Sequence, residues 1–104
     1  MDLEKLIQVG AFSQDYVEKS VEWGNNEFTV KIKKEMSPSD FEFIYLLSRG
    51  DDDSTMARRV SRSVLIDGQR ISYDVAKKLK HKLLLAMCEA INSVQGVIGE
   101  EKKN

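Results

Sequence analysis

The chain has 104 residues, of which 41% are hydrophobic, and its 16 basic and 17 acidic side chains give a formal net charge of −1 at pH 7. This length and composition are typical of one globular domain, and the near-neutral charge excludes a global field that would attract nucleic acid or an anionic membrane. The single cysteine, Cys88, excludes an intrachain disulfide, and no window resembles a signal peptide or a membrane span, so we expect a soluble, cytoplasmic protein.

The first predicted elements are a short helix over residues 2–9, which Gly10 ends, and an antiparallel hairpin that starts at Tyr16. Apolar and polar residues alternate on both sides of "GNN", where positive backbone φ angles are tolerated. The apolar positions on the expected dry face are Val17, Val21, Trp23, Phe28, Val30 and Ile32. Lys19 interrupts this face, and we place it past the edge of the core.

The next predicted helix runs from Pro38 to Arg49, with Ser37 as its N-cap and Gly50 as its end. Its apolar residues cover most of its circumference: they are Phe41, Phe43, Ile44, Tyr45, Leu46 and Leu47. Such a helix is buried on more than one side, either by its own fold or by another chain. We therefore take Phe41, Phe43, Ile44 and Leu47 as candidate partner contacts, with a central core helix as the alternative.

A turn with three consecutive aspartates, Asp51 to Asp53, follows, and we expect these carboxylates to stay solvated. The segment after it is predicted to be helical at least to Val60 and to carry Arg58, Arg59 and Arg62 as an exposed cationic patch for acidic partner segments. The end of this segment, "VLIDGQRIS", is compatible with a tight hairpin around the Asp-Gly pair. A turn and a short extended piece are the preferred interpretation.

The last and longest helix is predicted from the N-cap Ser72 to the terminator Gly96. A stripe at helical spacing should face the hairpin: Val75, Leu79, Leu83, Met87, Ile91 and Val94. We expect an α+β fold in which one antiparallel hairpin packs against three or four helices, with a long C-terminal helix. Residues 1–96 form the single domain, and residues 97–104 form a polar tail.

The sequence has few reactive side chains, and their spacing argues against catalysis, cofactor binding and metal binding. His81 and Cys88 are the only residues of their types, and their helical spacing separates them by about 10 Å. We interpret His81 as solvated and Cys88 as a buried core residue. The aspartates of the acidic turn lack the Gly and the closing Glu of a calcium loop. The arginines and lysines could neutralise phosphates, but their neighbours supply no aromatic stacking platform for bases and the whole chain is slightly acidic, which disfavours nucleic-acid binding.

The segment from Met56 to Gly96 resembles the tail assembly chaperones of long-tailed, lambda-like bacteriophages. The features that match are an Asp-Gly turn, a short extended piece and a capped C-terminal helix, carried by Val64, Leu65, Asp67, Gly68, Ile71, Ser72 and the helix through Ile91 and Asn92. The resemblance covers about residues 36–96, and the N-terminal hairpin is a looser match. The alternative is a small regulatory or adaptor module that binds nucleic acid through a local basic patch.

The resemblance implies a non-catalytic protein of the host cytoplasm that coats the tape measure protein, keeps it soluble and is absent from the finished virion. It also implies a longer form, made by a −1 ribosomal frameshift, that recruits the major tail protein. The surplus apolar surface would suit such a client and is also compatible with a homo-oligomer. No membrane partner is expected, and nucleic acid is disfavoured.

The last residues, Lys102, Lys103 and Asn104, predict a −1 slip site, because their codons are almost entirely adenines. If both lysines use AAA, the gene reads A AAA AAC or A AAA AAT, and both decoding tRNAs can re-pair one base upstream. The alternative is an ordinary solubilising terminus. The gene sequence tests the prediction: an AAG codon for Lys103, or no open −1 frame across the stop codon, would contradict it.

Overall fold

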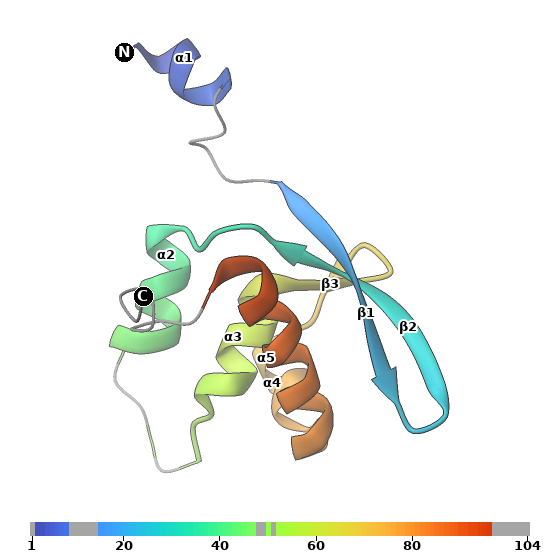
Figure 1. Ribbon diagram of the computed structural model, residues 1–104. Coiled ribbons are helices and arrows are strands. Elements are labelled where there is room, and N and C mark those ends of the chain that lie inside the picture. The colour runs from blue at the N-terminus through green and yellow to red at the C-terminus, as the bar shows by residue number, and fades with distance from the viewer. Residues whose placement is uncertain (1, 9–14, 48–49, 51, 97–104) are drawn as a thin grey trace, which may run out of the picture.

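A computed structural model describes residues 2–8, 15–47, 50 and 52–96 of the chain (Figure 1). The elements, in order, are α1 (Leu3–Gln8), β1 (Tyr16–Trp23), β2 (Asn26–Lys33), α2 (Pro38–Phe41), a π-helix η1 (Glu42–Leu46), α3 (Thr55–Ser63), β3 (Val64–Ile66), β4 (Gln69–Arg70), α4 (Tyr73–Lys77) and α5 (His81–Gln95). The predicted α+β class and the short first helix are confirmed. The predicted polar tail, residues 97–104, lies outside the described residues.

The sheet is antiparallel, has four strands and follows the order β1-β2-β3-β4. The first hairpin and its dry face are confirmed, since Val21, Val30 and Ile32 are buried. Gly24 turns the chain with a φ of 63°, whereas Asn25 does not adopt a positive φ. This combination is typical of a type II′ turn, whose twist matches that of the strands. Lys19, placed past the edge of the core, is half-buried.

A second hairpin, β3–β4, extends the sheet beyond the two predicted strands. Asp67 and Gly68 both have positive φ angles, 55° and 75°, as a type I′ turn requires. The preferred interpretation of this segment as a turn and an extended piece was wrong, and the tight hairpin is correct. Ile66 pairs with Val30 of β2, and this pairing adds the hairpin to the sheet.

The predicted long C-terminal helix is broken into α4 and α5, although its two ends are as expected. The hydroxyl of Ser72 accepts a hydrogen bond from the Val75 amide, and Gly96 ends α5 with a φ of 86°. Lys80 is extended, with a ψ of 149°, and so interrupts the helical repeat. The phase shift buries Ala76 and leaves Val75 52% exposed, which corrects its prediction as a core residue.

The helix predicted over residues 38–49 is shorter and changes character. Ser37 and Asp40 form a capping box: the Asp40 amide donates to Ser37 Oγ (3.1 Å) and the Ser37 amide donates to Asp40 Oδ2 (3.1 Å). After α2 the helix changes from α to π geometry in η1. The Leu47 amide there donates to the Glu42 carbonyl, five residues earlier, as in a π-helix. Leu47 is extended, with a ψ of 148°, so the helix ends at Leu46.

The hydrophobic core lies between the dry face of the sheet and the helices α3 and α5 (Figure 1). Its buried members are Val21, Val30, Ile32, Ala57, Val60, Val64, Ala76, Leu84, Met87, Cys88 and Ile91. Burial raises the pKa of the Cys88 thiol, an effect that the nearby charge of Arg59 reduces. Cys88 is therefore the core residue that the sequence predicted, and His81 is exposed as expected.

Asp40 connects α2 to the sheet and to α3. It is 3% exposed, and its carboxylate lies 2.6 Å from Lys33 Nζ and 3.6 Å from Arg62 Nη1. Burial alone would raise the pKa of this carboxyl group, but the hydrogen bonds from Lys33 and Ser37 and the Lys33 charge bring it below its ordinary value. The ionised form is thus the one that stabilises the fold.

We predict that Asp40→Asn lowers the free energy of unfolding by about 1–3 kcal/mol at pH 7, because Lys33 loses its buried partner. A depressed pKa stabilises the fold above the ordinary carboxyl range, and this contribution is lost as the pH falls through the folded-state pKa. The difference between variant and wild type should therefore shrink below about pH 4. Urea unfolding at several pH values measures it. Asp67→Asn, at an exposed turn, is the control, and a pH-independent difference would contradict the prediction.

Candidate partner-binding site

The segment formed by α2, η1 and Leu47 exposes three large apolar side chains. Phe41, Leu46 and Leu47 are 37%, 65% and 52% exposed, and we refer to them as the apolar patch. Tyr45 is half-buried and packs its ring against that of Phe41, with a centroid distance of 5.2 Å. Two of the predicted contacts, Phe41 and Leu47, belong to this patch, and Leu46 joins them.

The opposite side of the same segment faces the protein. Ile44, one of the predicted partner contacts, is completely buried, so it packs inside the protein and is not accessible to a partner. Phe43 is half-buried, and its ring meets the Tyr73 ring edge-on, with centroids 6.2 Å apart and an interplanar angle of 89°. The predicted helix is therefore two-sided: one side packs on the fold, and the other presents the apolar patch to solvent.

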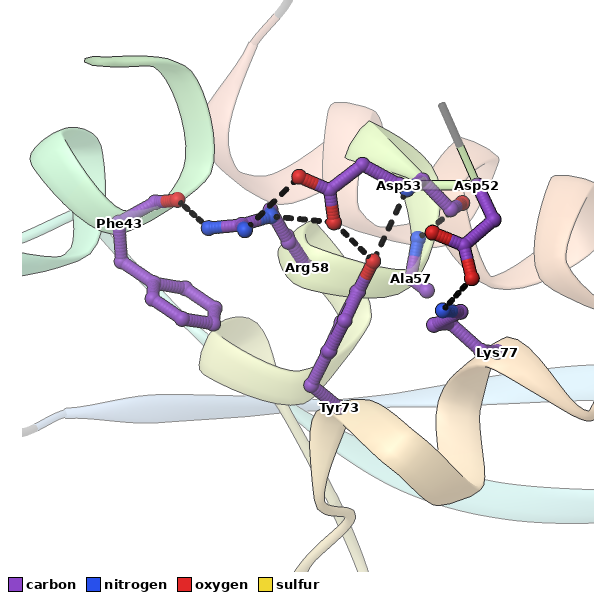
Figure 2. A network of polar contacts seen from close by, with 8 residues as sticks. Phe43, Asp52, Asp53, Ala57, Arg58, Tyr73 and Lys77 are labelled. Carbon is purple, nitrogen blue, oxygen red and sulfur yellow. Dashed lines mark hydrogen bonds and ion pairs between the residues drawn. The ribbon is translucent and has the colours of Figure 1, made fainter. Parts of the chain in front are cut away.

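Arg58 of α3 joins this segment to the rest of the protein (Figure 2). Its Nη1 donates to the Phe43 carbonyl oxygen at 2.6 Å, and its Nη2 donates to Asp53 Oδ2 at 3.0 Å. The guanidinium carbon also lies 4.6 Å from the centre of the Phe43 ring. One guanidinium group thus contacts a carbonyl of the π-helix, a carboxylate and an aromatic face.

Asp53 and Tyr73 complete this network. The Tyr73 hydroxyl donates a short hydrogen bond to Asp53 Oδ1 and accepts one from the Ser54 amide at 3.0 Å (Figure 2). Ser54 is also the N-cap of α3, since its hydroxyl accepts from the Ala57 amide. We refer to Asp53, Arg58 and Tyr73 as the anchor. It fixes the start of α3 and the start of α4 beneath η1.

The expectation that the aspartates of the acidic turn stay solvated was wrong for Asp53. Its side chain is 12% exposed because it faces Arg58, whereas that of Asp52 is 90% exposed and lies 3.2 Å from Lys77 Nζ. The hydrogen bond to Asp52 raises the pKa of Lys77. Asp51 lies outside the described residues. The two described aspartates of the turn, Asp52 and Asp53, thus have different environments, and no local sequence pattern distinguishes them.

The expectation that Arg58, Arg59 and Arg62 form an exposed cationic patch was also wrong for two of these three residues. Arg58 and Arg59 are each 8% exposed, because Arg58 is in the anchor and Arg59 Nη2 donates to the Gly96 carbonyl at 3.2 Å. Arg62 is half-buried, lies 4.3 Å from the Phe43 ring centre and pairs with Asp40. All three arginines thus bind groups of the protein itself: Arg58 and Arg62 contact the segment of α2 and η1, and Arg59 binds the end of α5.

The described part of the chain contains no group of three or more His, Cys, Asp or Glu residues placed to hold a metal ion. None of its described helices is long and apolar enough to cross a membrane. The arrangement that stands out is therefore a contact surface: a short apolar patch on a segment that charged and aromatic side chains hold from beneath.

The structure is thus a small α+β domain with one candidate contact surface. The family profile described as phage tail assembly chaperone, TAC, matches residues 4–95, which is most of the chain. The chain therefore belongs to this family, and the resemblance found in the sequence is confirmed. Its role is that of a chaperone in phage tail assembly, in a family that is generally non-catalytic. Neither the curated proteins nor the solved structures include a match.

The anchor predicts a large difference between two neighbouring aspartates. Asp53→Asn should lower the free energy of unfolding by about 2–4 kcal/mol, because the buried Arg58 loses its counter-charge. Asp52→Asn is the matched control, and it should change the stability far less, because an exposed ion pair contributes little. Chemical denaturation of both variants measures the difference. Equal effects would show that the anchor does not stabilise the fold.

Proposed function

We propose that this chaperone binds the tape measure protein through the apolar patch and keeps it soluble while the tail is built. The observation that carries the proposal is the exposure of Phe41, Leu46 and Leu47 on a segment whose other side is held by the anchor. Several large apolar side chains exposed on one short segment of a small domain are typical of a binding site. The family assignment supplies the process in which the partner takes part.

The partner surface that fits best is an apolar stripe on a helix. A short ridge of Phe and Leu side chains can pack against positions spaced three and four residues apart on an amphipathic helix. Burying each of these side chains contributes about 1–3 kcal/mol, and association has an entropic cost that offsets much of the sum. One domain therefore binds weakly, and this suits a chaperone that has to be released when the tail is complete.

The longer, frameshifted form belongs to the same proposal. The residues that would overlie the slip site, 102–104, lie outside the described residues, and recruitment of the major tail protein would be carried out by the added segment. The alternative of a nucleic-acid-binding module loses support from the burial of Arg58 and Arg59, which removes two charges from the basic patch.

The test uses Leu46, since this side chain is 65% exposed and its replacement leaves the core intact. Leu46→Asp should weaken binding of the tape measure protein at least about tenfold, equivalent to about 1.4 kcal/mol, because a carboxylate would be desolvated in the contact. Co-expression of the two proteins, followed by quantification of soluble tape measure protein and of the complex, provides the measurement. Phe43 is a less specific probe, because its ring also packs on Arg58 and Arg62.

Leu85→Asp is the matched control, because Leu85 is 44% exposed on α5 and lies outside the apolar patch. This variant should solubilise the tape measure protein as well as the wild type does. Circular dichroism should give the same melting temperature for Leu46→Asp as for the wild type, within a few degrees. Unchanged client binding by a folded Leu46→Asp chain would remove the apolar patch from the proposed function.

A further inference from the structure

A polar pocket lies at one end of the sheet, where β1 begins and β2 ends. Tyr16 and Lys33, which pair across the two strands, both line it, and its volume is about 320 Å³. The other polar or charged residues of its wall include Ser37, Asp40, Arg62 and Arg70. Because most of this wall is polar, a charged group fits the pocket better than an apolar one.

The basic side chains of the pocket outnumber the acidic ones. Lys33, Arg62 and Arg70 line it, against a single carboxylate, that of Asp40. Lys33 Nζ lies 2.6 Å from Asp40 Oδ2, so these two charges neutralise each other. The charges of the two arginines remain, and a pocket whose walls carry an excess of one sign of charge attracts the opposite sign. The occupant that this charge favours is an anion.

The two arginines of the pocket also keep hydrogen-bond donors open. Arg62 Nη1 lies 3.6 Å from Asp40 Oδ1, which is longer than an N–H···O hydrogen bond of about 2.7–3.2 Å. The contact of Arg62 with the Phe43 ring supplies no oxygen acceptor. Within the described residues neither arginine donates a side-chain hydrogen bond, and Arg70 is exposed. The planar fork of an open guanidinium group matches the two oxygens of a carboxylate.

A carboxylate fits this pocket better than a more highly charged oxyanion. Asp40 keeps its own negative charge in the wall, and its repulsion of an occupant grows with the charge of that occupant. The pocket also adjoins the segment that carries the apolar patch, since Asp40 directly precedes Phe41 in α2. A protein that packs on the apolar patch therefore brings its neighbouring side chains to the pocket.

We propose that this pocket binds the carboxylate of an Asp or Glu side chain next to the apolar stripe of the partner protein. The two contacts differ in kind. The apolar patch contributes burial, and the pocket contributes an ion pair that selects which stripe binds and in which direction. The identification of the partner as the tape measure protein rests on the proposed function, whereas the affinity of the pocket for a carboxylate does not.

The test uses the full chain and a blocked glutamate, acetylated at its amino group and amidated at its α-carboxyl group, so that the side-chain carboxylate is its single charge. In NMR titrations at constant ionic strength, this probe should give saturable shifts of the Nε–H signals of Arg62 and Arg70. Blocked glutamine, which has a similar shape and no charge, should give none. Inorganic phosphate should bind more weakly than the blocked glutamate.

Arg70→Gln is the decisive variant, because Arg70 is exposed and its replacement leaves the core intact. It should weaken binding of the blocked glutamate at least about threefold, as expected for the loss of one partly solvated ion pair. Arg62→Lys keeps the charge but loses the planar fork, so it should weaken binding as well. If Arg62→Lys is unfolded by circular dichroism, Arg70→Gln alone decides. Lys82→Gln, which removes an exposed charge of α5 outside the pocket, is the matched control and should bind like the wild type.

Equal shifts with blocked glutamine, tighter binding of phosphate, or an unchanged affinity of Arg70→Gln would each overturn the assignment of a carboxylate site. With the tape measure protein, Arg70→Gln should also form less complex than Lys82→Gln does, and equal amounts would overturn the link to the partner. Failure of the proposed function is distinguishable, because Leu46→Asp would then leave client binding unchanged while the pocket still bound the blocked glutamate.

Discussion

The buried guanidinium group of Arg58 is the constraint on which the functional surface depends. A buried cation is tolerated only where its donors and its charge are satisfied, and here the partners come from η1, from the turn before α3 and from α4 through Tyr73. Each partner lies in a different part of the chain. The hydrogen bonds and the ion pair of this one side chain therefore fix the relative positions of all three parts. The apolar patch is held in place because it belongs to the segment that contains η1.

A second charged group restrains the same segment at its other end. Asp40 closes the capping box of α2 and pairs with Lys33 of β2 and Arg62 of α3. Among the apolar side chains of residues 38–47, Ile44 is the one that is fully buried. These polar contacts and Ile44 together attach the segment to the fold, and Phe41, Leu46 and Leu47 remain exposed. A segment fixed in this way can expose Leu46 and Leu47 and remain folded.

Periodicity and capping in the sequence predicted the parts of this fold that local chemistry determines. The alternation around Gly24 gave the first hairpin, and Ser37 and Ser72 begin helices as expected. Distant partners could not be read from local patterns. The hydrogen bond between Tyr73 and Asp53 spans 20 residues, and the one between the buried Arg58 and the Phe43 carbonyl spans 15 residues. The break at Lys80 also lacks a local signal, because neither Gly nor Pro occurs there.

The same limits explain which part of the binding surface could be found from the sequence. The excess of apolar residues after Pro38 correctly marked the segment, but only the fold separates Ile44, which is buried, from Leu46, which is exposed. A patch of three side chains buries little apolar surface, and the entropic cost of association offsets much of the gain, so binding by one such domain is weak.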